Sequence, residues 1–315
     1  MQFGCAYYGS HLESHLNYDL NDIRQAGCVD VVITLSENDM RYFPGKLRLA
    51  PEIAAKKGLR LFAVPWGFGN LFGGGTISKF VLEFPESMQI DSLGRSAGMG
   101  CYNNQIFRDN YMKFILDVSE QGYAGVLVDE PTPIDCYCSA CRQKYRSMYN
   151  ADLRPDSKDT TKIAEFRKEC VISFITEMAD FVKNKTKLIS QIAMSPLDRE
   201  LWERVANIPS IDIFGVDPYW LVQNSKAHKQ RTFEWFMDMS AKAVKVAQKA
   251  KKPSVIWMNC WRIAAGREEE ICKGMLAVKG LKPDMIYAWS YKGGLGTHEA
   301  CDNPAKAWDN FIKGF

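Results

Sequence analysis

Short apolar segments rich in Val, Ile and Phe alternate with longer amphipathic segments along the whole chain. The apolar segments predict strands over residues 3–8, 29–35, 60–65, 125–129, 188–194, 211–217, 254–259 and 285–290. The amphipathic segments predict helices over residues 18–25, 49–57, 105–121, 163–183, 199–205, 232–249, 268–279 and 304–313. Because strand and helix alternate strictly, we expect parallel strands joined by crossovers in a single (β/α)8 TIM barrel, one α/β catalytic domain over residues 1–315.

A doubly wound open sheet is the alternative architecture. That fold normally carries a glycine-rich phosphate-binding turn after its first strand, whereas residues 7–11 here read Tyr-Tyr-Gly-Ser-His. Eight strand–helix units also suit a closed barrel better than an open sheet. The sequence therefore favours the barrel.

Two stretches exceed the length of minimal barrel loops. Residues 67–102 follow the third predicted strand and residues 132–161 follow the fourth. Both loop insertions leave the C-terminal ends of strands, where barrels build their functional sites. We therefore expect the chemistry of the chain to lie near them.

Charge and hydropathy limit the kinds of molecule that we expect the protein to bind. The chain has 40 basic and 37 acidic residues, well mixed, with a net charge of +3. No basic face predicts nucleic-acid binding, and no run of about 18 apolar residues predicts a membrane span. The first ten residues do not resemble a signal peptide, so we expect a cytoplasmic protein acting on a small, nearly neutral molecule. The sequence leaves a homo-oligomer open.

Three closely spaced cysteines are the most specific signal in the chain. Cys136, Cys138 and Cys141 lie within six residues, and three thiolates in such a run suit a tetrahedral metal ion. Cys101, on the loop that leaves the first insertion, is the fourth ligand that we expect. Four thiolates leave no open position, so the predicted zinc is structural. Surface thiols or a redox pair are the alternative, and the reserve fourth ligands are Cys28 and Cys5.

The residues around this cluster resemble glycoside hydrolase family 42, the β-galactosidases, and glycosidase-like barrels that share the cluster. The similarity covers residues 98–145 and rests on Gly100–Arg108, the Gly125–Pro131 strand, and Cys136-x-Cys138-x-x-Cys141-Arg142. The resemblance implies a TIM-barrel glycosidase with Glu130 as acid/base and a structural zinc on the four cysteines, Cys101 included.

The chain departs from that family at three points. Asp129 stands where the family has Asn before its catalytic Glu, and residues 255–261 supply no Glu for the nucleophile that the family places on its seventh strand. The family's trimerisation domain has no counterpart here. The resemblance therefore implies a glycosidase barrel without supporting β-galactosidase activity.

Glycoside hydrolysis usually needs two carboxyl groups that flank one bond. We expect Glu130, at the end of the fourth predicted strand, to be the general acid/base. Asp217, at the end of the sixth, is the candidate nucleophile or water-activating base. Asp129 would hold a sugar hydroxyl or replace Asp217. Adjacent residues on a strand point to opposite sides, so Asp129 and Glu130 share a site only if the backbone turns there, as Pro131 suggests. Capping, a loop salt bridge or an Asp-Pro turn are the structural alternatives.

Aromatic residues gather near the predicted strand ends. Sugars stack their CH faces on aromatic rings and need directional partners for their hydroxyls, whereas barrel interiors favour branched aliphatic residues. The candidate substrate-binding residues are Tyr7, Trp66, Tyr219, Trp220, Asn259, Trp261, Trp289 and Tyr291.

The function that these patterns predict is a glycoside hydrolase with a two-carboxylate acid/base mechanism. One alternative is a carbohydrate-binding barrel without hydrolytic activity, which the missing Glu on the seventh strand favours. Another is a barrel lyase or isomerase acting on a sugar derivative, with Lys292 as its base. The three hypotheses differ in whether opposed carboxyl groups meet in an open pocket.

Overall fold

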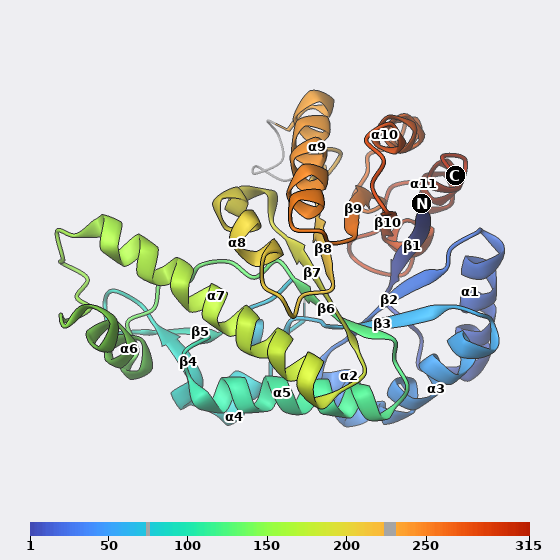
Figure 1. Cartoon of the computed structure of the whole chain (residues 1–315). Coiled ribbons are helices and arrows are strands. Elements are labelled where there is room, and N and C mark those ends of the chain that lie inside the picture. The colour runs from blue at the N-terminus through green and yellow to red at the C-terminus, as the bar shows by residue number, and fades with distance from the viewer. Residues whose placement is uncertain (74–75, 224–230) are drawn as a thin grey trace.

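The computed structural model describes residues 1–73, 76–223 and 231–315, and its centre is a closed barrel of eight parallel strands (Figure 1). Around the ring the strands are β1 (Gln2–Tyr7), β10 (Met285–Trp289), β9 (Ser254–Asn259), β8 (Ile213–Val216), β7 (Ile189–Met194), β6 (Gly125–Asp129), β3 (Arg60–Pro65) and β2 (Asp30–Leu35). The predicted (β/α)8 barrel is confirmed, and all eight predicted strands form within two residues of their expected ends.

Helices surround the barrel and connect its strands. They are α1 (Glu13–Gln25), α3 (Pro44–Lys56), α5 (Gln105–Glu120), α7 (Thr160–Lys185), α8 (Trp202–Ala206), α9 (Phe233–Lys249), α10 (Glu269–Lys279) and α11 (Pro304–Ile312). Several begin at side-chain caps: Asn104, Asp159 and Thr232 accept a hydrogen bond from the backbone N–H three residues later. Within the described residues, no helix has the length and hydropathy needed to cross a membrane.

Side chains separate into two apolar layers because successive residues of a strand point to opposite faces. One layer fills the barrel interior and includes Ala6, Phe62, Leu127, Ile213, Trp257 and Tyr287. The other packs the outer strand faces against the helices and includes Val31, Val126, Val128 and Ile286. Each interior residue therefore indicates which later residues of its strand also point inward at the C-terminal rim.

The first insertion folds over the C-terminal side of β3. It contains α4 (Phe80–Glu83) and an antiparallel hairpin of β4 (Met88–Ile90) and β5 (Ser96–Gly100). The second insertion contains α6 (Ser139–Tyr149), and Figure 1 shows α6, β4 and β5 on the same side of the molecule, beside the N-terminal half of α7.

A single carboxylate anchors the first insertion to the barrel. Glu37, the first residue of α2 (Glu37–Tyr42), accepts hydrogen bonds from the Gly69 N–H at 3.0 Å and the Ser78 hydroxyl at 2.6 Å. It also accepts the backbone N–H groups of Lys79 and Phe80, each at 2.7 Å. Because these donors lie at both ends of the 69–80 segment, Glu37 fixes the path of the loop that continues from Trp66.

We predict that Glu37→Gln lowers the free energy of unfolding by about 2 kcal/mol, since the amide turns an N–H₂ group toward backbone donors and loses the charge on its hydrogen bonds. Urea unfolding measures this loss. Glu83→Gln, on α4 of the same insertion, is the matched control, because Glu83 forms a half-exposed ion pair with Arg41. Equal stability of the two variants would contradict the anchoring role of Glu37.

Candidate functional site

A pocket of about 250 Å³ opens at the C-terminal ends of the barrel strands. Its acidic lining comes from Asp129, Glu130, Asp217 and Glu299. Its remaining lining is Trp66, Gly73, Tyr219, Trp261 and Trp289. The structure therefore brings together all three carboxyl groups that the sequence singled out, along with four of the predicted aromatic residues.

A backbone turn brings two neighbouring carboxyl groups into one pocket. Leu127 fills the barrel interior, so Asp129, two residues later on β6, also points inward. Glu130 has a φ of 44°, in the left-handed region that a non-glycine residue rarely adopts. Its N–H still donates to the Ala193 carbonyl at 2.9 Å, which fixes the turn against β7. The expected turn before Pro131 is therefore present, and both side chains reach the pocket.

The insertion closes over Asp129 because Gly73 has no side chain. A Cβ atom on Gly73 would lie 2.2 Å from Asp129 Oδ2, well inside contact distance. Gly73 thus lets the loop anchored by Glu37 pass directly over the carboxyl group.

Burial dominates the electrostatics of the three central carboxyl groups. It raises the pKa of Asp129, Glu130 and Asp217 above their ordinary values, because each loses water that would stabilise its charged form. The charge of Glu130 adds to the rise for Asp129 and Asp217. For Glu130, hydrogen bonds with Asp217 and Ser195 and the charge of Arg231 oppose the rise. The pocket therefore favours the protonated forms of these carboxyl groups more than water does.

Glu130 and Asp217 contact each other. A hydrogen bond between their carboxyl groups lowers the pKa of Glu130 and raises that of Asp217. The expectation from the sequence was a pair facing each other across the site, with a glycosidic bond between them. A direct contact leaves no room for that bond, because carboxyl groups that flank it stand about 5 Å or more apart.

Aromatic rings form the walls of the pocket. Trp66 and Trp289 stack with ring centroids 5.1 Å apart, and Tyr219 meets Trp261 edge-on at 5.7 Å. Tyr8, just beyond β1, packs edge-on against both stacked tryptophans, and its hydroxyl accepts a hydrogen bond from Trp289 Nε1 at 3.2 Å. Tyr8 is thus the aromatic residue that β1 contributes beside the pocket.

Four predicted substrate-binding residues lie outside the pocket lining. Tyr7 and Tyr291 point toward α1, where their hydroxyls donate to Asp19 and Asp22, each at 2.7 Å.

The other two residues outside the pocket lining, Trp220 and Asn259, make packing and hydrogen-bond contacts with neighbouring segments. Trp220 stacks on Phe236 of α9 at 4.0 Å. Asn259 is fully buried, and its Oδ1 accepts the N–H groups of Trp220 at 2.8 Å and Leu221 at 3.1 Å. Strand alternation explains Tyr7 and Trp220, which are each one residue out of phase with the inward-pointing Tyr8 and Tyr219.

Sequence reasoning missed Gly73, Glu299, Ser195 and Arg231 as residues in or near this site, and it selected Tyr7 instead of Tyr8 from the two aromatic residues at the end of the first strand. Alternation separates the two tyrosines, but choosing Tyr8 requires knowing that Ala6 faces the barrel interior. Glu299 lies nine residues beyond its predicted strand, on a loop without regular periodicity, so no pattern in the sequence marked it.

The four cysteines of the predicted cluster come together. The Sγ atoms of Cys101, Cys136, Cys138 and Cys141 all lie within 4.8 Å of one another, and the four residues are buried. Cys101 follows β5 while the other three lie at the start of α6, so the cluster joins the two insertions.

The donor set fits a metal ion, because four thiol groups that converge at this distance match tetrahedral thiolate coordination. The Asn103 side chain donates to Cys141 Sγ at 3.2 Å, the kind of outer contact that orients a ligand. The reserve ligands Cys5 and Cys28 contact each other instead, in the layer between β1 and α1.

The raised pKa of Asp129 predicts a pH-dependent stability. Its folded pKa lies above the unfolded value of about 3.9, so its contribution is present below that pH and is lost as pH rises through the folded pKa. We expect Asp129→Asn to unfold at higher urea concentration than the wild type near pH 8, with a smaller difference near pH 4.

Asp91→Asn is the control of opposite sign. Hydrogen bonds from the Arg95 and Leu93 backbone lower the pKa of Asp91, so this variant should lose stability relative to wild type as pH rises. A stability difference for Asp129→Asn that does not change with pH would contradict the burial argument.

Comparison of the sequence with protein-family models and with curated proteins finds no match. Solved structures do match. An endo-1,4-β-D-mannanase from Thermotoga petrophila has a TM-score of 0.59 and 13% identity, over 99% of this chain and 98% of that chain. A second endo-β-1,4-mannanase structure from that organism gives 0.58 and 12%, over 100% and 75%. Trehalose-6-phosphate hydrolase from Bacillus licheniformis gives 0.59 and 13%, over 94% and 65%. At these identities the similarity is one of fold: the chain has the barrel that these glycoside hydrolases have, and membership of family 42 is not among the findings.

Proposed function

We propose that this protein is a glycoside hydrolase that uses carboxyl groups at the C-terminal rim of its barrel. The observation that carries the proposal is a cluster of three carboxyl groups with raised pKa values in a tryptophan-lined pocket, Asp217 buried and Asp129 and Glu130 half-buried. Protonated carboxyl groups supply a general acid, and aromatic walls suit the CH faces of a sugar. The position of the pocket agrees with where TIM-barrel enzymes place their chemistry.

Glu130 is the general acid in this proposal. Burial raises its pKa, which favours its protonated form, and the hydrogen-bonded Asp217, whose pKa is also raised, is the neighbouring group that can pass a proton to it. When the glycosidic C–O bond breaks, Glu130 gives the proton to the leaving oxygen. Asp217 is the hydrogen-bond partner of Glu130 during this proton transfer. The Oδ1 atom of Asp217 is buried without a hydrogen-bond partner among the described residues and is free to accept a hydrogen bond from a sugar hydroxyl. Asp129 is placed to hold another hydroxyl under the Gly73 loop.

The substrate is a carbohydrate of modest size. Trp66 and Trp289 present stacked rings on one wall, and Tyr219 and Trp261 meet on another. A pocket of about 250 Å³ holds roughly one or two sugar residues. Such a substrate suits intracellular carbohydrate metabolism.

The alternative of a lyase or isomerase with Lys292 as base receives no support from the geometry. Lys292 Nζ pairs with Asp22 at 3.1 Å and lies over the Tyr18 and Tyr291 rings, on the α1 side of the barrel. A binding barrel without activity would not need a buried acid that retains its proton, since desolvating carboxyl groups costs stability. The hydrolase therefore accounts for more of the site.

The cysteine cluster holds a structural zinc ion in this proposal, with Cys101, Cys136, Cys138 and Cys141 as its four ligands. The ion ties β5 to the start of α6 and so stiffens both insertions above the pocket. Free thiols persist in a reducing compartment, which is consistent with a cytoplasmic protein.

For the general acid, we predict that Glu130→Gln reduces kcat/KM on aryl glycosides by about 10³-fold. The loss should be smaller for leaving groups of low pKa, because these need little protonation as they depart. Steady-state kinetics on a panel of aryl glycosides measures both effects. Glu203→Gln, an exposed residue on α8 paired with Lys249, is the matched control and should keep wild-type rates.

Two results would remove the proposal. The first is wild-type turnover in Glu130→Gln on a glycoside with a poor leaving group, which would exclude Glu130 as the acid. The second is a wild-type protein that binds sugars and cleaves none of the panel.

For the metal, we predict one zinc ion per chain by elemental analysis, and its complete loss in Cys138→Ser. Loss of the zinc ion that joins the two insertions should lower Tm by about 5–10 °C, since a structural zinc site contributes its binding energy to folding. Cys272→Ser, a half-exposed cysteine outside the cluster, is the control that should retain both zinc and Tm. A metal-free wild-type protein with an unchanged Tm in Cys138→Ser would contradict the assignment.

A further inference from the structure

Because Glu130 and Asp217 contact each other, the proposed hydrolysis still lacks a second carboxyl group on the other face of the sugar. The acid side of the pocket holds Glu130, Asp217 and Asp129 together. A glycosidic bond must lie between its proton donor and a second carboxyl group that acts on the other face of the sugar. That second group has to come from another side of the pocket.

Glu299 lines the pocket and comes from its opposite side. It lies on the loop that follows β10 and η4 (Tyr291–Gly294). In the closed ring, three strands separate β10 from β6 in one direction and three in the other. In contrast, only β7 separates β6 from β8, which carries Asp217. Glu299 therefore lies on the loop that follows β10, the strand opposite β6 in the ring.

The local contacts hold the Glu299 carboxylate in place. Its backbone N–H donates to Thr297 Oγ1 at 3.1 Å, and its carbonyl accepts the Arg262 N–H at 3.0 Å. Its Oε1 pairs with Arg262 Nη2 at 3.2 Å and with His298 Nε2 at 3.3 Å. The side chain is 15% exposed, so it is shielded but open to the pocket. Arg262 and His298 therefore hold the Glu299 side chain in one orientation at the edge of the pocket.

The phenol ring of Tyr8 packs edge-on against Trp66 and Trp289 of the pocket wall. Burial raises the pKa of Tyr8, and the charges of Glu299 and Asp129 both add to that rise, so the Tyr8 hydroxyl is near both carboxyl groups. The backbone of Tyr8 is fixed from below: its carbonyl accepts hydrogen bonds from Lys46 Nζ at 2.8 Å and Thr34 Oγ1 at 3.1 Å.

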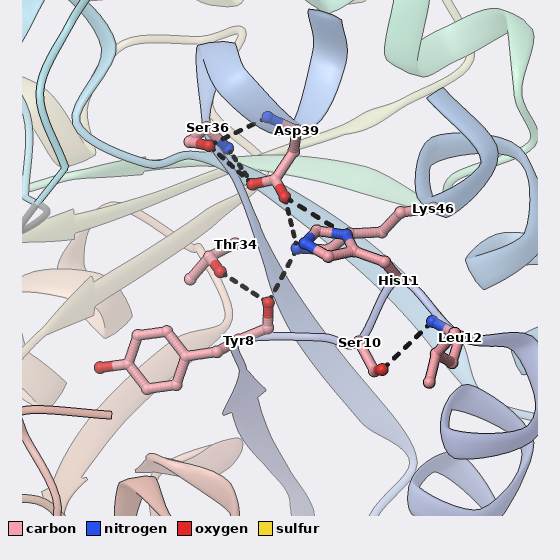
Figure 2. Close-up of polar contacts among 8 residues, drawn as sticks. All are labelled: Tyr8, Ser10, His11, Leu12, Thr34, Ser36, Asp39 and Lys46. Atoms are coloured by element: carbon pink, nitrogen blue, oxygen red, sulfur yellow. Dashed lines mark hydrogen bonds and ion pairs between the residues drawn. The ribbon is translucent and has the colours of Figure 1, made fainter. Parts of the chain in front are cut away.

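Figure 2 shows the Tyr8 ring projecting away from this cluster, in which the buried Lys46 also pairs with Asp39 at 3.2 Å. The ring then packs edge-on against Trp66 and Trp289 in the wall of the pocket.

We propose that Glu299 is the base that activates the attacking water, so that the enzyme inverts the anomeric configuration. This inference rests on the proposed hydrolase function. As Glu130 gives its proton to the leaving oxygen and the C–O bond breaks, the water oxygen bonds to the anomeric carbon from the opposite face. Glu299 takes the proton that this water loses. One water is consumed, and Glu299 returns its proton to Glu130 through solvent.

The experiment uses the full chain, its Glu299→Gln and Glu299→Ala variants, and Glu270→Gln as a matched control. Glu270 is a surface residue paired with Arg267, remote from the pocket lining. We expect Glu299→Gln to lower kcat by about 10³-fold with KM within about threefold. The loss should be the same for good and poor leaving groups, unlike that of Glu130→Gln, because water must be activated whichever group departs.

Two further readouts separate a catalytic base from a structural residue. Proton NMR of the first-formed wild-type product should show the inverted anomer. Sodium azide should restore turnover to Glu299→Ala by forming a glycosyl azide, which also shows that this variant is folded. A retained anomer, or Glu299→Gln with a kcat within threefold of wild type, overturns the proposal for Glu299. If the wild type is active and Glu130→Gln is defective in that case, the hydrolase function stands. A wild type without activity on any glycoside overturns both.

Discussion

Strand alternation in a closed parallel barrel is the constraint on which the site depends. Each strand has one face in the barrel interior, and two-residue periodicity carries that orientation to the C-terminal rim. Leu127 and Tyr287 fill the interior, so Asp129 and Trp289 point into the pocket two residues later. The same rule turns Tyr7 toward α1. The apolar packing that stabilises the barrel therefore also selects the side chains that meet the substrate.

Two parts of the pocket do not follow from strand alternation, and other interactions hold each of them in place. Glu130 enters only because its backbone adopts a left-handed conformation, at a cost that the hydrogen bond to Ala193 helps to offset. The Gly73 loop lies over Asp129 because Glu37 anchors the insertion from below. The left-handed turn at Glu130 and the Gly73 loop are thus each held by hydrogen bonds to neighbouring elements. These two features bring the three carboxyl groups together.

Concentrating acidic groups in a buried pocket opposes stability and would serve the proposed catalysis. Burial and mutual repulsion raise the pKa values of Asp129, Glu130 and Asp217, so the folded state favours their protonated forms. A large apolar core around the barrel can sustain that cost. The proposed base, Glu299, has the opposite surroundings, with Arg262 and His298 at its carboxylate. One pocket therefore contains carboxyl groups surrounded by other acids and a carboxyl group surrounded by basic side chains. Acid and base catalysis requires two such different environments.

The sequence by itself determined the features that depend on neighbours along the chain. Apolar periodicity predicted the eight strands, and the spacing of Cys136, Cys138 and Cys141 predicted a metal-binding run. It also placed Asp129, Glu130 and Asp217 at strand ends, since a strand end is a local signal. The strands form as predicted and the cysteines converge, because secondary structure and close spacing along the chain are short-range properties, while metal binding stays a prediction.

Only the tertiary structure decided the contacts between distant segments. The hydrogen bond between Glu130 and Asp217 joins the ends of β6 and β8, which are separated by β7 in the barrel and are far apart in the sequence. The position of Glu299 depends on a loop closed by Arg262, and aperiodic loops carry no orientation in their residue pattern. Tyr8 lies between these cases: alternation pointed to it, but assigning its face required knowing which residues of β1 fill the interior. Closure of the barrel sets these distances, because it brings together residues that are far apart in the chain.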